Sequence, residues 1–172
     1  MSSEAGSLVY HPDLEALQAS LAPPRKGPRA RMAEVLPFIQ LDQWPPEGLV
    51  AKVLARAASL PDVMVRQSRM ASPETAALAL LDEFAVGPAE AFIDLSEFCH
   101  LHAAPQGGIL LTLPELILDP VIDLGWGELH PAAQTGSISP CLVAVYAPRD
   151  EREVAAALTL VEVSWRFARD EW

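Results

Sequence analysis

The chain has 172 residues, a length typical of one domain that buries about 70% of its unfolded surface. Half of the residues are apolar and the net charge is −11, so we expect a sizeable core and an acidic surface. Between Met70 and Pro148 there is no Lys or Arg, which argues against a nucleic-acid or phosphate site built from this region. The longest uncharged runs contain His, Pro and Gly, so we predict no membrane span and no membrane partner.

The start of the chain and the cysteines predict a cytoplasmic location. Met1-Ser2-Ser3-Glu4 lacks the basic and apolar regions of a signal peptide. Cys99 and Cys141 each lie in strand-like runs, and we expect two buried free thiols rather than a disulfide.

The first 46 residues predict an irregular N-terminal extension that is packed on or linked to a single domain over 47–172. Residues 12–22 favour a short helix, after which prolines interrupt the chain and a basic run predicts a solvated linker. An apolar stripe predicts an amphipathic helix over 47–60, and alternation predicts a strand over 62–68. The run 75–81 is compatible with either a helix or a strand.

The second half contains the clearest pattern of elements. Extended segments are predicted over 91–93 and 97–103, with a hairpin turn at 105–108, a return strand over 109–113, a short extended segment over 126–130 and an apolar strand over 141–146. Helices are predicted from Pro114 to about Leu124, with Gly125 at the C-terminal cap, and after Asp150, where Glu153 completes a capping box. This order predicts an α+β fold: a mainly antiparallel sheet with a central hairpin, covered by helices on one face, with the C-terminal helix packed on the sheet.

Two histidine pairs are candidates for a functional site. His100 and His102 are two residues apart on a predicted strand, so their side chains share one face at roughly 6–7 Å. Phe98 is expected on the same face, with Cys99 and Leu101 opposite. Glu128 and His130 repeat the spacing, and together the pairs offer ligands that suit zinc, iron or manganese. Three interpretations remain open: a divalent metal held by His100, His102 and His130, a metal-free polar pocket, and histidines that only stabilise the fold.

Trp126 and Arg149 are further ligand-binding candidates. Trp126 either packs in the core or provides a stacking surface for a ligand. Arg149 either anchors an anionic group or pairs with Glu128 or another nearby acid. Asp150 is expected to cap a helix. The common motifs of nucleotide, serine-hydrolase and zinc-protease sites do not occur.

Three ordered motifs carry a resemblance to a known family. They are Glu97-Phe98-Cys99-His100-Leu101-His102, Gly125-Trp126-Gly127-Glu128-Leu129-His130-Pro131 and Tyr146-Ala147-Pro148-Arg149-Asp150-Glu151. With them, the stretch 91–168 resembles the luciferase-like domain family of bacteria and fungi. The resemblance implies a domain type and marks these residues, but it implies no light-producing reaction and no substrate. Where the family usually has a histidine on the return strand, this chain has Leu110, and it has Gln106-Gly107-Gly108 in place of the usual Asp-Gly-Ser turn.

These observations predict a luciferase-like domain with a pocket lined by His100, His102, Trp126, Glu128, His130 and Arg149. Such a pocket is expected to bind a small ligand or a divalent metal. The alternative is a non-catalytic protein-interaction or structural module, and the sequence leaves open whether the protein is an enzyme. A homo-oligomer is compatible with the sequence. A concave pocket at the histidine strand favours ligand binding, whereas a flat apolar patch with dispersed histidines favours a module.

Overall fold

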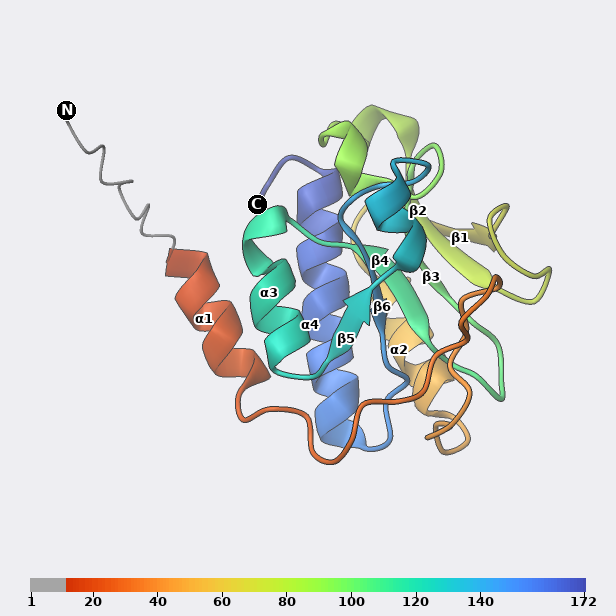
Figure 1. The fold of residues 1–172 in the computed structure, drawn as a ribbon. Coiled ribbons are helices and arrows are strands. Elements are labelled where there is room, and N and C mark those ends of the chain that lie inside the picture. Colours follow the sequence, from red (N-terminus) through yellow and green to blue (C-terminus); the bar gives the residue numbers. More distant parts are fainter. Residues whose placement is uncertain (1–11) are drawn as a thin grey trace.

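The computed structural model describes residues 12–172, which form a sheet with helices packed on it (Figure 1). The helices are α1 (Pro12–Leu21), α2 (Leu49–Ala57), α3 (Glu115–Asp123) and α4 (Glu151–Ala168). The strands are β1 (Val63–Gln67), β2 (Ala76–Leu80), β3 (Glu97–Leu101), β4 (Ile109–Thr112), β5 (Gly127–Leu129) and β6 (Leu142–Val145). The prediction that no signal peptide is present concerns Met1-Ser2-Ser3-Glu4, which lie outside the described residues.

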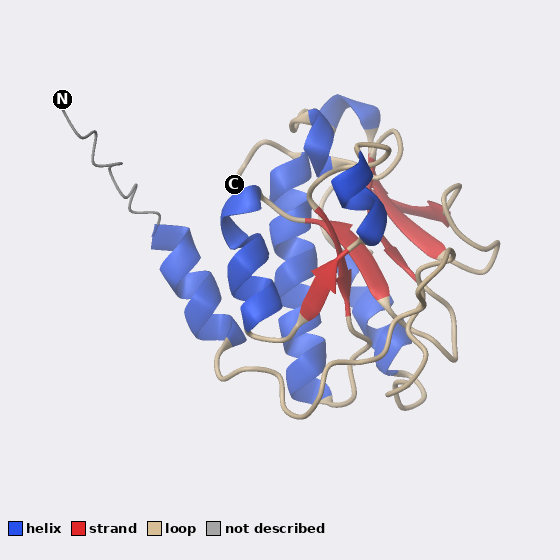
Figure 2. Cartoon of the chain, in the orientation of Figure 1, coloured by secondary structure: helices blue, strands red, loops and turns tan. Residues whose placement is uncertain are grey.

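The six strands form one sheet in the order β1-β2-β3-β4-β6-β5, and every neighbouring pair is antiparallel. The β3–β4 hairpin occupies the middle of the sheet, where His100 is paired with Leu110. The long helix α4 packs against β3 and β4, and α1, α2 and α3 gather around it on the same side (Figure 2). The predicted α+β fold, with helices on one face, is therefore confirmed.

The two faces of the sheet have different cores. On the helix face, alternate strand residues such as Leu101, Leu111 and Val143 pack in the large core shared with the helices. The opposite face, which we call the loop face, carries a smaller cluster of Leu110, Leu142 and Ala144 under Phe38 of the N-terminal segment. The polar residues His100, His102 and His130 lie on this face, and His130 caps the short 3₁₀ helix Pro131–Thr135.

The structure resolves the ambiguity over 75–81. This run forms β2, which pairs with β1 on one side and β3 on the other. Leu78 and Leu80 are fully buried in the helix-face core, and Ala77 and Ala79 are buried as well. A strand with neighbours on both edges can be apolar throughout, which explains why its periodicity was uninformative.

Local signals place the ends of α3 and α4. Gly125 has φ +77° after the last residues of α3, and the amides of Gly125 and Trp126 donate to the carbonyls of Ile122 and Val121. This Schellman arrangement requires the left-handed conformation that glycine adopts without strain. At α4, the Asp150 carboxylate accepts from the Glu153 amide at 2.9 Å, as predicted. The Glu153 carboxylate accepts from the Arg149 amide, one residue earlier than a capping box requires.

The N-terminal segment crosses the molecule from α1 to α2 (Figure 1). Leu17 and Leu21 of α1 lie in the helix-face core, and Phe38 covers the loop face. The side chain of Gln40 is buried, and its Oε1 accepts from the Ala147 amide at 2.9 Å. These contacts join residues 12–46 to both cores.

Both cysteines are free and buried, as predicted. Burial and nearby Glu97 raise the pKa of the Cys99 thiol well above its usual value, and burial raises that of Cys141. Neither thiol is therefore an ionised nucleophile at neutral pH. Within residues 12–172, no helix combines the length and the low charge that crossing a bilayer requires.

Candidate functional site

The three histidines His100, His102 and His130 line one cavity of about 320 Å³ on the loop face, which we call the histidine pocket. The other lining residues are apolar: Leu36, Pro37, Phe38, Met70, Ala71 and Leu110. His100 and His102 come from β3 and its end, whereas His130 follows β5. The strands β4 and β6 separate β3 from β5, so the structure brings together residues from distant parts of the sheet.

A β-bulge in β3 determines which side chains face this pocket. Opposite Leu78 and Ala79 of β2, the pairing residues of β3 are Cys99 and Glu97, so Phe98 is an extra residue. Phe98 consequently packs in the helix-face core. The expectation that Phe98 shares a face with His100 is wrong, because regular alternation does not hold across a bulge. Glu97 faces His100 in its place.

Glu97 and His100 form a buried carboxylate–imidazole pair. Glu97 Oε1 lies 2.8 Å from His100 Nδ1, and the two side chains are 0% and 3% exposed. The Ser68 hydroxyl donates to the same Glu97 oxygen at 3.0 Å. Arg66 lies 3.7 Å from the other oxygen and is partly exposed. With Nδ1 engaged by a carboxylate, the imidazole is held in one orientation with Nε2 on the opposite side of the ring.

His102 packs edge-on against His100, with ring centroids 5.3 Å apart. Burial, reinforced by the neighbouring His100, lowers the pKa of His102 to about 4. Its imidazole is therefore neutral at neutral pH. Among the described residues, the buried Nε2 atoms of His100 and His102 have no hydrogen-bond partner.

His130 completes the pocket from the far side. Its Nδ1 accepts from the Ala132 amide at 3.2 Å, which caps the short 3₁₀ helix Pro131–Thr135. Its ring meets Phe38 edge-on at 4.9 Å. Burial and the nearby His100 lower the pKa of His130 as well. All three histidines line the same largely apolar cavity. His102 and His130 contribute neutral imidazoles to it, beside His100 with its bound carboxylate.

The other predicted site residues lie outside the pocket lining. Glu128 accepts from the Tyr146 hydroxyl at 2.7 Å, and burial together with this bond raises the pKa of Tyr146 to about 12. Trp126 lies in the helix-face core and donates from its indole to the Leu21 carbonyl at 3.1 Å. Arg149 binds Glu153 through its Nε at 3.0 Å and Gln43 at 3.1 Å. The structure thus unites the histidines and places Trp126, Glu128 and Arg149 in other contacts.

Within residues 12–172, the histidine pocket does not supply three protein ligands for one metal ion. Across the described part of the chain, no three His, Cys, Asp or Glu side chains lie close enough together to hold a metal ion. The residue directly opposite His100 on β4 is Leu110, which lines the pocket with an apolar side chain. His100 and His102 remain a pair of candidate ligands, with Glu97 as a hydrogen-bond partner of the kind that orients metal-binding histidines.

Sequence reasoning did not identify Glu97, Ser68 and Phe38 as parts of this site. Glu97 is three residues from His100, a spacing that places two side chains on opposite faces of a regular strand. Nothing in the local pattern reveals the bulge that brings them together. Ser68 and Phe38 come from distant segments, and only their packing shows the connection. The one sequence signal for Glu97 was its position in the same family-like motif as His100 and His102.

Comparison with known proteins supports the domain type. Residues 96–164 match the family model described as the Luciferase domain. The predicted resemblance to the luciferase-like family is therefore confirmed over this segment, which contains all three pocket histidines together with Trp126 and Arg149. The match covers part of the chain, and Phe38 and Ser68 lie outside it. No curated protein and no solved structure matches the chain.

Proposed function

We propose that this luciferase-like domain binds a small organic molecule that carries a hydroxyl group on an apolar body. The observation that carries the proposal is the pair of unpartnered Nε2 atoms of His100 and His102, both buried, in a cavity with apolar walls. His100 and His102 are only 2% and 9% exposed. A buried polar atom without a partner costs about 1–3 kcal/mol, and a ligand hydroxyl within the pocket would remove that cost.

Glu97 gives His100 a defined chemical role in this proposal. A carboxylate at Nδ1 favours the tautomer that has its proton on Nδ1, which leaves the Nε2 lone pair directed away from Glu97. In that state His100 accepts a hydrogen bond from the ligand hydroxyl and can take its proton as a general base. The Ser68 hydroxyl lies on the Nδ1 side, 3.4 Å from that atom. It is therefore placed to support the pair and not to attack a ligand.

The character of the pocket favours a neutral ligand. His102 is uncharged near neutral pH because its pKa is lowered to about 4. No Lys or Arg of the described residues lines the pocket, so a carboxylate or phosphate ligand would lack a cation. An apolar body would instead pack against Phe38, Leu110 and Pro37.

Phenol and toluene test the proposal, since they share a ring and differ in the hydroxyl. In protein with ¹⁵N-labelled histidine, phenol is expected to shift the Nε2 resonances of His100 and His102. Toluene should bind roughly tenfold more weakly, because it cannot pair with a buried acceptor. Glu97→Gln should move the His100 proton towards Nε2 and weaken phenol binding about tenfold, whereas Glu128→Gln, a carboxylate outside the pocket, should leave binding unchanged.

The same spectra distinguish the alternatives. Equal effects of phenol and toluene, or no movement of the histidine resonances with either, would contradict the proposal. The second candidate is a metal site, which the Nε2 atoms of His100 and His102, without a partner among the described residues, and the carboxylate on His100 also favour. If calorimetry shows that the wild type binds ZnCl₂ but not phenol, and that His100→Ala/His102→Ala no longer binds ZnCl₂, the assignment passes to a metal.

A further inference from the structure

Two surface depressions share lining residues with the histidine pocket and lie between it and α2. A second depression of about 260 Å³ shares Pro37 and His102 with the pocket. A third, of about 280 Å³, shares Glu74, Ala103 and Ala104 with the second, and His102 lines all three. We call the second and third depressions together the hairpin groove, because they follow the end of β3 where it enters the turn to β4.

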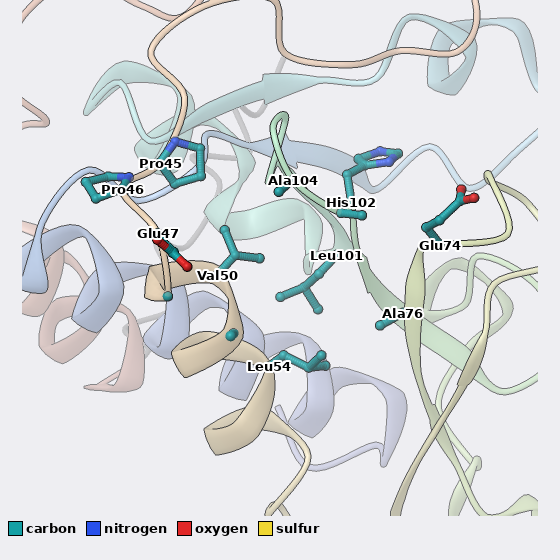
Figure 3. Close-up of a pocket in the computed structure, with 13 residues that line it drawn as sticks. Pro45, Pro46, Glu47, Val50, Leu54, Glu74, Ala76, Leu101, His102 and Ala104 are labelled. Atoms are coloured by element: carbon teal, nitrogen blue, oxygen red, sulfur yellow. The ribbon is translucent and has the colours of Figure 1, made fainter.

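The residues that line the hairpin groove come from both faces of the sheet. His102 belongs to the loop face, whereas its neighbour Leu101 is buried in the helix-face core, and both line the third depression. Figure 3 shows Leu101 facing the same space as Val50 and Leu54 of α2, while the ring of His102 turns to the other side of the strand. An occupant that reaches from the histidines to α2 must therefore bend around the strand end, which a flexible chain can do and a rigid ring system cannot.

The walls of the groove are suited to an uncharged aliphatic chain. Val50, Leu54, Pro45 and Leu101 supply apolar surface, and small residues at Ala76, Ala103 and Ala104 leave room between α2 and the hairpin. The charged side chains at the groove are two carboxylates, Glu47 and Glu74, and no Lys or Arg of the described residues lines it. An anionic chain would be repelled, whereas methylene groups would be removed from water against apolar walls.

We infer that the ligand of this domain is an elongated amphipathic alcohol, with its hydroxyl at His100 and His102 and a flexible aliphatic chain in the hairpin groove. This inference rests on the proposed function, since it extends the same ligand beyond the histidine pocket. His102 lines both the histidine pocket and the hairpin groove, so one ligand can contact it from both parts. The chain contributes affinity through burial, and the head group fixes orientation through the buried imidazoles.

A series of straight-chain alcohols tests the inference in the intact 172-residue chain. Affinity measured by calorimetry is expected to rise from n-butanol through n-hexanol to n-octanol, by up to about fourfold per methylene while the groove is being filled. Ala51→Trp places a large side chain at the groove wall on α2, and should abolish the advantage of n-octanol while leaving n-butanol unaffected. Ala55→Trp is the matched control, because Ala55 is also exposed on α2 but does not line the groove.

The outcomes separate this inference from the proposed function. Equal affinity for n-butanol and n-octanol, or an n-octanol advantage that survives Ala51→Trp with the fold intact by circular dichroism, would overturn the groove. If phenol binds as described above while the alcohol series stays flat, the histidine pocket stands and only the groove is lost. If neither phenol nor any alcohol binds, both proposals fail together.

Discussion

At the scale of single residues, the most consequential arrangement is the buried pair of Glu97 and His100. Such a pair is costly unless both partners are hydrogen-bonded, and here Ser68 and the imidazole share one carboxylate oxygen. The second imidazole, His102, has no such carboxylate and is kept neutral by burial. These two neighbouring histidines therefore differ in their hydrogen bonds. The bulge at Phe98 brings the Glu97 carboxylate to His100 and not to His102.

His102 should make the stability of the protein sensitive to acid. Its pKa is about 4 in the folded state and about 6.5 when unfolded, so between these values the unfolded chain binds more protons. The contribution of His102 to the free energy of unfolding is fully present above about pH 6.5. It is lost as the pH is lowered towards 4, by on the order of 2–3 kcal/mol. Urea unfolding at several pH values should show a shallower loss for His102→Leu than for the wild type. Parallel pH profiles would contradict the burial of a neutral imidazole.

At the scale of elements, the strand β5 depends on a close approach between backbones. A Cβ atom on Gly127 would lie 2.4 Å from the Ala144 carbonyl oxygen of β6, and this contact is with backbone, which cannot move aside easily. Gly125 is needed for a different reason, since it ends α3 in the left-handed region. The Gly-Trp-Gly motif therefore serves to end a helix and start a strand around a buried indole.

Gly127→Ala is expected to destabilise the protein by about 2 kcal/mol or more, because β5 must separate from β6 to admit the methyl group. Gly108→Ala provides a control directly before β4, since a Cβ there has 3.9 Å to its nearest neighbour. Chemical denaturation of both variants measures the difference. Equal stability of the two would show that β5 shifts freely, and would remove the structural explanation for the motif.

At the scale of the whole molecule, one carboxylate joins the N-terminal segment to α4. Glu153 is only 5% exposed, and it lies 3.6 Å from Arg25 and binds both the amide and the guanidinium of Arg149. Arg149 in turn donates to the Lys26 carbonyl at 2.6 Å. Burial lowers the pKa of Arg25, and the hydrogen bonds to Glu153 raise that of Arg149. The segment that carries Phe38 to the histidine pocket is thus attached at this point.

Glu153→Gln should cost roughly 3 kcal/mol or more of stability, because it leaves two partly buried guanidinium groups without their carboxylate. Glu151→Gln is the matched control, since Glu151 is exposed on the same first turn of α4 and pairs with Lys52, and its loss should cost under about 1 kcal/mol. Limited proteolysis should also cut residues 22–46 faster in Glu153→Gln. If both variants unfold alike, the attachment of this segment lies elsewhere.

The sequence by itself determined the helices, the hairpin at the centre of the sheet, the caps at Gly125 and Asp150, and the shared face of His100 and His102. These features depend on residues a few positions apart, through alternation, capping and turn chemistry. Only the tertiary structure decided that Glu97 lies beside His100, that Arg149 binds Glu153, and that Phe38 and His130 close the pocket. Those contacts join segments far apart in the chain or cross a bulge, and they are set by how the core packs and which buried polar groups find partners.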